Sequence, residues 1–211
     1  MTARRARPGR RRWALLAVAA AAAVLAALGA LFVAFPPRPA APAPLTAPPP
    51  AAGMAVGSPA APVKLVMLFD LRCPFCAEAE AQLGPLLERL VAEGRVEVIL
   101  VGVPAHPGSL QLHRLLYCAY GKLGNSTLKL VDELYAAYPN YTEQMRLLAP
   151  YNCTAAPTAE QIYAELQPVA QWLRSHGIPL ATPTYIVERG GKAYVVVGAR
   201  PQEVESLLTA T

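Results

Sequence analysis

The stretch LFDLRCPFCAEAE, residues 68–80, places Cys73 and Cys76 three positions apart between an apolar run and a segment rich in helix formers. The run VKLVMLF (63–69) is typical of a buried strand, and residues 77–94 predict a helix that ends at a glycine. A cysteine pair in this position can bind a metal, form a structural disulfide or exchange electrons with other thiols. The rest of the chain decides among these functions.

The metal alternative lacks further ligands at a suitable spacing. A zinc site needs two more cysteines or histidines, normally a second CxxC or a histidine pair. The other candidates are isolated along the chain: Cys118, Cys153, His106, His113 and His176. A purely structural CxxC disulfide would close so short a loop that it would remove little entropy from the unfolded chain. We therefore expect no metal site and favour the redox interpretation.

The position of Cys73 supports the redox interpretation physically. Its sulfur follows a predicted strand and precedes a predicted helix, where free backbone amides and the partial positive charge of the helix stabilise a thiolate. The thiolate is the form that attacks a disulfide. Cys76, one turn into the helix, is positioned to resolve the mixed disulfide and is expected to be more buried. Pro74 and Phe75 lie between the cysteines and are expected to tune the pair.

The remaining pattern places the cysteine pair in an α/β domain. Residues 95–103 (RVEVILVGV) are apolar on both faces and predict a central strand, and residues 106–177 predict a helical insertion. Residues 182–188 and 192–199 predict two strands joined by a glycine-containing turn, and residues 201–210 predict a closing helix with a proline in its first turn. The predicted order is strand, helix, strand, helical insertion, strand, strand, helix.

Three motifs, LFDLRCPFC, ATPTYIV and GARPQEVESLL, together resemble the thioredoxin fold, and specifically the DsbA, DsbC and DsbG class of extracytoplasmic thiol–disulfide proteins. The resemblance covers about residues 63–210. It implies a cis peptide bond between Thr182 and Pro183, whose neighbouring backbone groups would pair with a substrate chain as an added strand. It also implies a disulfide between Cys118 and Cys153 inside the insertion, whereas two free buried cysteines are the alternative.

Within this class the chain is most similar to the DsbC and DsbG catalytic domains, through Asp70, HPGSLQLHRLLYC (106–118) and VVGARP (196–201). CPFC is similar to the CPYC of DsbG. The chain departs from DsbC and DsbG because a predicted anchor and spacer occupy the place of their N-terminal dimerisation domain, and from DsbA because Phe75 replaces a histidine. Thioredoxin and DsbA also carry a buried acid where this chain has Met67. Asp70, which we expect to tune the active site, or water is then the candidate proton carrier.

The N-terminal part of the chain predicts a membrane tether. Residues 1–12 hold six of the 19 Lys and Arg residues, so the net charge of +5 comes from this tail, and we expect no nucleic-acid partner. Residues 13–35 carry no charge and are long enough to cross a hydrocarbon core of ~30 Å, with the basic tail in the cytoplasm. A cleaved signal peptide is the alternative.

Residues 36–62, with 10 of the 22 prolines, predict a semi-rigid spacer before a folded domain over residues 63–211. The three asparagines of the chain each open an N-x-Ser/Thr sequon, which suggests N-glycosylation of the insertion at Asn125, Asn140 and Asn152.

The sequence therefore predicts a membrane-anchored, extracytoplasmic thiol–disulfide oxidoreductase of thioredoxin fold. We expect it to form or reshuffle disulfides in exported cysteine-containing proteins, with the Cys73–Cys76 disulfide as its only redox group and no bound cofactor. A membrane redox partner would reset the pair. Two alternatives remain open, namely a dedicated reductant of the cytochrome-maturation type and a non-catalytic adaptor that binds copper(I) on the CxxC.

Overall fold

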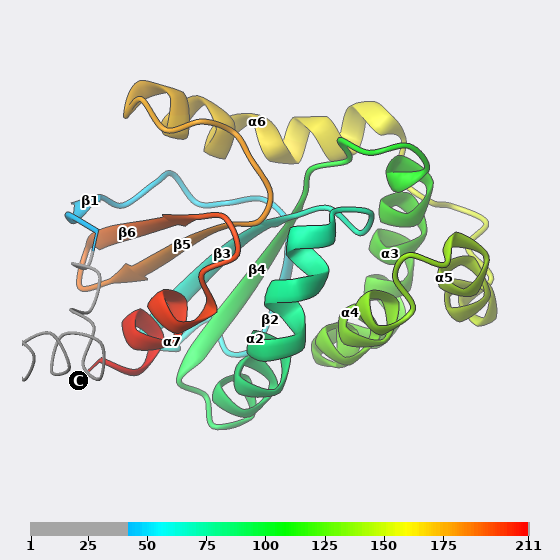
Figure 1. Cartoon of the computed structure of the whole chain (residues 1–211), viewed down its shortest axis with the longest axis horizontal. Coiled ribbons are helices and arrows are strands. Elements are labelled where there is room, and N and C mark those ends of the chain that lie inside the picture. The colour runs from blue at the N-terminus through cyan, green and yellow to red at the C-terminus, as the bar shows by residue number, and fades with distance from the viewer. Residues whose placement is uncertain (1–41, 211) are drawn as a thin grey trace, which may run out of the picture. The chain divides into compact units, whose positions relative to one another are not determined.

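The computed structural model describes residues 42–210, which contain a six-stranded mixed sheet with helices on both faces (Figure 1). The strand order is β1-β6-β5-β3-β4-β2. The strands are β1 (Leu45–Thr46), β2 (Met54–Val56), β3 (Val63–Phe69), β4 (Val96–Gly102), β5 (Thr184–Arg189) and β6 (Lys192–Val197). Only β3 and β4 pair in parallel, and all other neighbours are antiparallel.

The centre of the sheet is the β3-α2-β4 unit, in which α2 (Pro74–Ala92) connects the two parallel strands. Alternate residues of β3 face two separate apolar layers, as a strand with both faces covered requires. Leu65, Met67 and Phe69 pack with α2, α3 and α4, whereas Val66 and Leu68 pack with α6. The strand–helix–strand order predicted for residues 63–103 is therefore confirmed.

The predicted helical insertion is also confirmed. It consists of α3 (Ser109–Leu123), α4 (Thr127–Ala136), α5 (Tyr141–Leu148) and α6 (Ala159–Ser175), with short 3₁₀ turns at Gly124–Ser126 and Ala149–Tyr151. Figure 1 shows α6 lying across one face of the sheet, while α2 and the closing helix α7 (Pro201–Thr209) lie on the other. The fold is a mixed α/β thioredoxin-like fold with a helical insertion.

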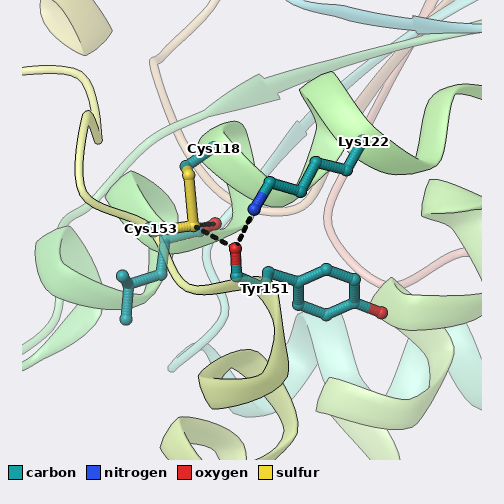
Figure 2. Close-up of a disulfide and its surroundings, with 5 residues drawn as sticks. Cys118, Lys122, Tyr151 and Cys153 are labelled. Carbon is teal, nitrogen blue, oxygen red and sulfur yellow. Dashed lines mark hydrogen bonds between the residues drawn. A yellow bond between two sulfur atoms is a disulfide. The ribbon is translucent and has the colours of Figure 1, made fainter.

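The insertion contains a disulfide between Cys118 of α3 and Cys153, which follows the second 3₁₀ turn (Figure 2). Their Cα atoms lie 5.9 Å apart across a sequence separation of 35 residues. The Lys122 ammonium donates a hydrogen bond to the Tyr151 carbonyl beside it. The pairing that the family resemblance implied is therefore present, and the alternative of two free cysteines is wrong.

The predicted spacer over residues 36–62 is wrong in its second half. Within residues 42–62, Leu45–Thr46 pairs with β6 and Met54–Val56 pairs with β4, both as short antiparallel edge strands. Met54 and Val56 are fully buried. The prolines flank these strands, so they remove no ladder hydrogen bond and do not prevent pairing at a sheet edge. The folded domain thus begins well before Val63.

The basic tail (1–12), the predicted anchor (13–35) and the start of the spacer lie outside the described residues. Between residues 42 and 210, no helix is both long enough and apolar enough to span a membrane.

Candidate active site

Cys73 lies at the N-terminus of α2, as the sequence predicts. The chain leaves β3 at Phe69 and turns at Asp70, where the Cys73 N–H donates to the Asp70 carbonyl at 3.0 Å. Cys73 is the N-cap residue in an extended conformation, and Pro74 occupies the first helical position, where its missing N–H costs no hydrogen bond. The Cys73 sulfur is therefore held beside the free amides of the first helical turn.

The surroundings of Cys73 favour a thiolate. The Cys76 thiol, as a hydrogen-bond partner, is the largest cause that lowers the pKa of Cys73, which falls to about 5 despite the opposing effect of burial. A hydrogen bond with Thr182 and the backbone N–H groups of Phe75 and Cys76 lower this pKa further. The Cys73 side chain is nevertheless covered, because the residue is only 2% exposed. The low pKa favours a nucleophilic thiolate at neutral pH, but a substrate sulfur must enter the covered site to react with it.

Cys76 differs from Cys73 in both burial and pKa. It is fully buried inside the first turn of α2. Burial raises the pKa of Cys76, and the hydrogen bond with Cys73 and the charge of Cys73 raise it further. The two thiols therefore differ in protonation state at neutral pH, with Cys73 ionised and Cys76 protonated. Between them, Phe75 is 59% exposed and stands out as a large apolar side chain on the surface.

The loop before β5 brings Thr182 to the cysteine pair. The Thr182–Pro183 peptide bond is cis, as the family resemblance implied. The Cys73 sulfur lies 3.4 Å from the Thr182 carbonyl oxygen, although 109 residues separate the two in the chain. A backbone hydrogen bond fixes Pro183, because its carbonyl accepts from the Gly198 N–H at 2.8 Å. The CxxC and the Thr-Pro motif thus lie next to each other in the fold.

The Asp70 carboxylate forms its hydrogen bonds with the loop before α3 and with Arg72, and not with the two cysteines. That carboxylate is fully buried and accepts hydrogen bonds from the Arg72, Ala105 and His106 N–H groups at 2.8–2.9 Å and from the Ser109 hydroxyl. The His106 ring nitrogen Nδ1 lies 2.7 Å from it. Burial would raise the pKa of Asp70, but these hydrogen bonds together lower it.

An acid held ionised by this many donors does not carry protons near neutral pH. We therefore infer that the Asp70 carboxylate ties the end of β3 to the loop before α3. The Asp70 backbone nevertheless contributes to the site, because a hydrogen bond with it lowers the pKa of Cys76. That Asp70 tunes the active site stays a prediction.

A group of polar side chains near Cys76, most of them buried, was not predicted from the sequence. Glu80 follows Cys76 by four residues on α2, and Tyr135 and Asp132 reach the same region from α4. Tyr185 of β5 is also buried there, and its hydroxyl has no hydrogen-bond partner within the described residues. The i, i+4 spacing of Cys76 and Glu80 was a signal in the sequence. No sequence signal placed Asp132 or Tyr135 beside them.

No group of three or more His, Cys, Asp or Glu side chains in residues 42–210 is arranged to hold a metal ion. The three histidines serve other contacts. His106 bonds to Asp70, His176 packs on the Trp172 ring, and His113 lies buried against Phe69.

The three sequon asparagines lie exposed on the insertion. Asn140 caps α5 by accepting a hydrogen bond from the Glu143 N–H, and Asn125 accepts one from the Gly57 N–H. Asn152 adopts a left-handed conformation with φ of 45° next to the disulfide-bonded Cys153.

Residues 51–191 match the family described as "Thioredoxin", which is 141 of the 211 residues. The chain belongs to this thioredoxin family. The match begins at residue 51, in agreement with the structured second half of the predicted spacer. A comparison of the sequence with curated proteins gave no significant match.

Several solved structures are similar in fold. A periplasmic thioredoxin-like protein from Salmonella enterica serovar Typhimurium is 21% identical, with a TM-score of 0.54 over 73% of this chain and 86% of that one. Pseudomonas aeruginosa DsbA2 is 22% identical, with a TM-score of 0.52 over 76% of this chain and 94% of that one. The catalytic domain of Proteus mirabilis ScsC is 20% identical, with a TM-score of 0.56 over 75% and 88%. At these identities the likeness establishes the shared fold.

Proposed function

We propose that this protein is a thiol–disulfide oxidoreductase that works through the Cys73–Cys76 pair. The observation that carries the proposal is the asymmetry of the two sulfurs, with a stabilised thiolate at Cys73 and a buried thiol at Cys76. Cys73 faces the Thr182 carbonyl, so a substrate chain lying along this loop would bring its own sulfur to Cys73.

The exchange balances as two thiol–disulfide steps. A substrate thiolate attacks the Cys73 sulfur of the oxidised pair, the Cys73–Cys76 bond breaks, and Cys76 leaves with the bonding electrons and takes up a proton. A second substrate thiolate then attacks the substrate sulfur of the mixed disulfide and releases Cys73 as a thiolate. The substrate loses two electrons, and the protein pair gains them.

The low pKa of Cys73 supports the oxidising direction. A thiolate that is stabilised in the reduced protein makes reduction of the disulfide more favourable, so the pair is a stronger oxidant. The proteins of similar fold support this proposal, because they include a periplasmic thioredoxin-like protein and DsbA2. We therefore propose disulfide formation or reshuffling in exported cysteine-containing proteins.

Membrane attachment is part of the proposal and rests on the sequence. The uncharged residues 13–35 would anchor the protein, and the part of the Pro/Ala-rich segment before the first strand would hold the thioredoxin-like domain away from the bilayer on the extracytoplasmic side. A membrane redox protein would then reset the pair. This partner would be a quinone-linked oxidase for disulfide formation or an electron carrier for reshuffling.

Glycosylation of the insertion is a separate proposal that rests on the exposure of Asn125, Asn140 and Asn152. The cap at Asn140 uses the side-chain oxygen, which leaves its nitrogen free for a sugar. Mass spectrometry of the protein from its native source, with and without glycosidase, tests it. An unchanged mass at all three sequons would refute it.

The test of the main proposal is the redox potential of the pair in the full-length protein, equilibrated with glutathione buffers. We expect a value closer to about −120 mV, the DsbA region, than to about −270 mV, the thioredoxin region. A value near the thioredoxin region would instead assign a dedicated reductant. Failure to exchange with glutathione, combined with tight stoichiometric binding of copper(I), would refute the proposal and assign the copper adaptor.

A further inference from the structure

A small cavity lies between α2 and α4, behind the turn that carries Cys76. Its volume is about 220 Å³, and Ala77, Glu80, Ala81 and Pro85 of α2 and Asp132, Tyr135 and Ala136 of α4 line it. Its rim at Ala81 and Ala136 is exposed, and Asp132 is partly exposed, whereas Glu80 and Tyr135 are buried. The cavity is therefore open to solvent, and Tyr135 in its wall is a hydrogen-bond neighbour of Cys76.

Two carboxyl groups meet in this cavity. Glu80 is only 3% exposed, and its Oε2 atom has no hydrogen-bond partner within the described residues. Asp132 reaches it from α4 because α2 carries no side chain at Gly84, where a Cβ atom would lie 2.2 Å from the Asp132 carboxylate. Two carboxyls in one small site do not both ionise, because like charges repel and a buried charge lacks solvation.

This pair therefore keeps a proton near neutral pH. Burial, followed by the hydrogen bond with Asp132 and the charge of Asp132, raises the pKa of Glu80 well above its ordinary value. Burial also raises the pKa of Asp132, while the hydrogen bond from Glu80 acts in the opposite direction. Glu80 is then the protonated donor and Asp132 the acceptor. Glu88 and Glu133 add negative charge on the solvent side of Asp132, which favours retention of the proton.

Tyr135 connects the carboxyl pair with the sulfur. Its hydroxyl donates to the Asp70 carbonyl at 3.1 Å and is a hydrogen-bond neighbour of Cys76, while its side chain lines the cavity together with Glu80. Tyr185, facing the same region from β5, adds a further buried hydroxyl near Glu80 and both cysteines. Tyr135 thus has its hydroxyl beside Cys76 and its side chain in the wall of the cavity that Glu80 and Asp132 share.

We propose that the Glu80–Asp132 carboxyl pair donates the proton that Cys76 gains when the disulfide opens and accepts it when the disulfide closes. The inference rests on the proposed function. On opening, the Cys76 thiolate takes the proton from Glu80, which becomes a carboxylate and is re-protonated from solvent through Asp132. On closing, Glu80 passes its proton to Asp132 and from there to solvent while it takes the proton of the Cys76 thiol, the Cys76 sulfur attacks Cys73, and the substrate sulfur leaves as a thiolate.

The test separates the two steps of oxidation by glutathione disulfide in the full-length protein. Attack by Cys73 forms the mixed disulfide, and attack by Cys76 closes the pair and sets the rate at high oxidant concentration. Acid quenching followed by mass spectrometry measures both rates between pH 5 and pH 9. The variants are Glu80→Gln, which keeps the shape but binds no ionisable proton, and Asp132→Asn. Glu78→Gln, on the exposed side of α2, is the matched control.

We expect Glu80→Gln to slow closure at least tenfold at pH 7, which is a modest share of what general acid–base catalysis commonly contributes. Formation of the mixed disulfide should stay within twofold of the parent, and closure should recover as the pH rises and hydroxide removes the proton. Asp132→Asn should slow closure less and change its pH profile. Glu78→Gln should behave as the parent.

Unchanged closure in a folded Glu80→Gln variant would overturn the inference while leaving the proposed function intact. If Glu80→Gln does not fold, Asp132→Asn decides, and an unchanged pH profile in that variant overturns the inference equally. Equal slowing of both steps would also overturn it, because a general distortion of the site would have that effect. A parent protein that fails to react with glutathione disulfide would overturn the proposed function, and the inference with it.

Discussion

The two cysteine pairs of this chain have the same chemistry but opposite surroundings. Cys73 and Cys76 lie within one turn at the start of α2, where backbone N–H groups point toward the first sulfur. Cys118 and Cys153 join α3 to a loop 35 residues later, and the Cys153 sulfur lies 3.6 Å from the Leu115 carbonyl oxygen and 3.9 Å from that of Tyr151. Hydrogen-bond donors stabilise a thiolate at Cys73 and outweigh the Thr182 carbonyl oxygen 3.4 Å from its sulfur, whereas the carbonyl oxygens near Cys153 disfavour a thiolate there.

The position of each pair therefore indicates what it does. A pair that closes a long loop constrains the unfolded chain, and a pair that closes a short loop at a helix N-terminus contributes little to stability but exchanges readily. We infer that the first pair is reactive and the second is structural, and each of the following experiments tests one side of this contrast.

The largest effect is expected for Cys73→Ser. Exchange with glutathione and with a reduced protein substrate should fall below detection, because the attacking sulfur is lost. The unfolding temperature should change little, since Ser fits the N-cap position. Substantial turnover in this variant would show that another sulfur is the nucleophile, and Cys73 would then not be the reactive member.

Cys118→Ser should destabilise the protein by about 3–4 kcal/mol, because a loop of some 35 residues is no longer closed in the unfolded state. Denaturant unfolding of the variant and of the Cys118→Ser/Cys153→Ser double variant measures the loss, and the double variant controls for the free thiol. Activity per folded molecule should be retained. Loss of activity at unchanged stability would mean that the insertion disulfide takes part in the exchange.

Asp70→Asn should cost about 2 kcal/mol, because a charged acceptor of several buried hydrogen bonds becomes a neutral one. The folded pKa of Asp70 lies below its unfolded value, so its stabilisation is complete above the unfolded pKa of about 4 and is lost as the pH falls. Unfolding midpoints between pH 3 and pH 7 should therefore fall less steeply in the variant. An equal acid dependence in both proteins would contradict this role.

Alkylation of Cys73 in the reduced protein should be half-maximal near pH 5. In Cys76→Ala the midpoint should rise by about one pH unit, equivalent to about 1.4 kcal/mol, because the strongest hydrogen bond to the thiolate is removed. Iodoacetamide labelling followed by mass spectrometry measures both curves. If Cys73 in the parent protein were alkylated with the midpoint of a free cysteine, its surroundings would not stabilise the thiolate, and this part of the contrast would be wrong.

Phe75→Ala should change the stability least, by at most about 0.5 kcal/mol, because the ring is 59% exposed. We expect weaker binding of protein substrates and an unchanged rate with glutathione, which is too small to use the apolar surface of the ring. Equal loss with both substrates would instead indicate that Phe75 acts on the sulfur itself.

Much of the active-site half of the fold follows from local patterns. Each of β3, α2 and β4 occupies one continuous segment with the composition typical of its structure. The CxxC lies between the strand and the helix in the sequence, so its place at the helix N-terminus follows directly. The edge strands at Leu45–Thr46 and Met54–Val56 were missed, because two or three residues between prolines carry no periodic signal and become strands only when a neighbouring strand accepts them.

Local sequence patterns predicted the order of the elements, the position of the CxxC at a helix N-terminus and the helical insertion, because propensity and periodicity act over short distances along the chain. Tertiary structure alone decided that Asp70 organises a loop and that Glu80 meets Asp132 beside Cys76. The physical reason is that the protonation state of a carboxyl depends on which donors, charges and solvent surround it, and these come from residues far apart in the chain.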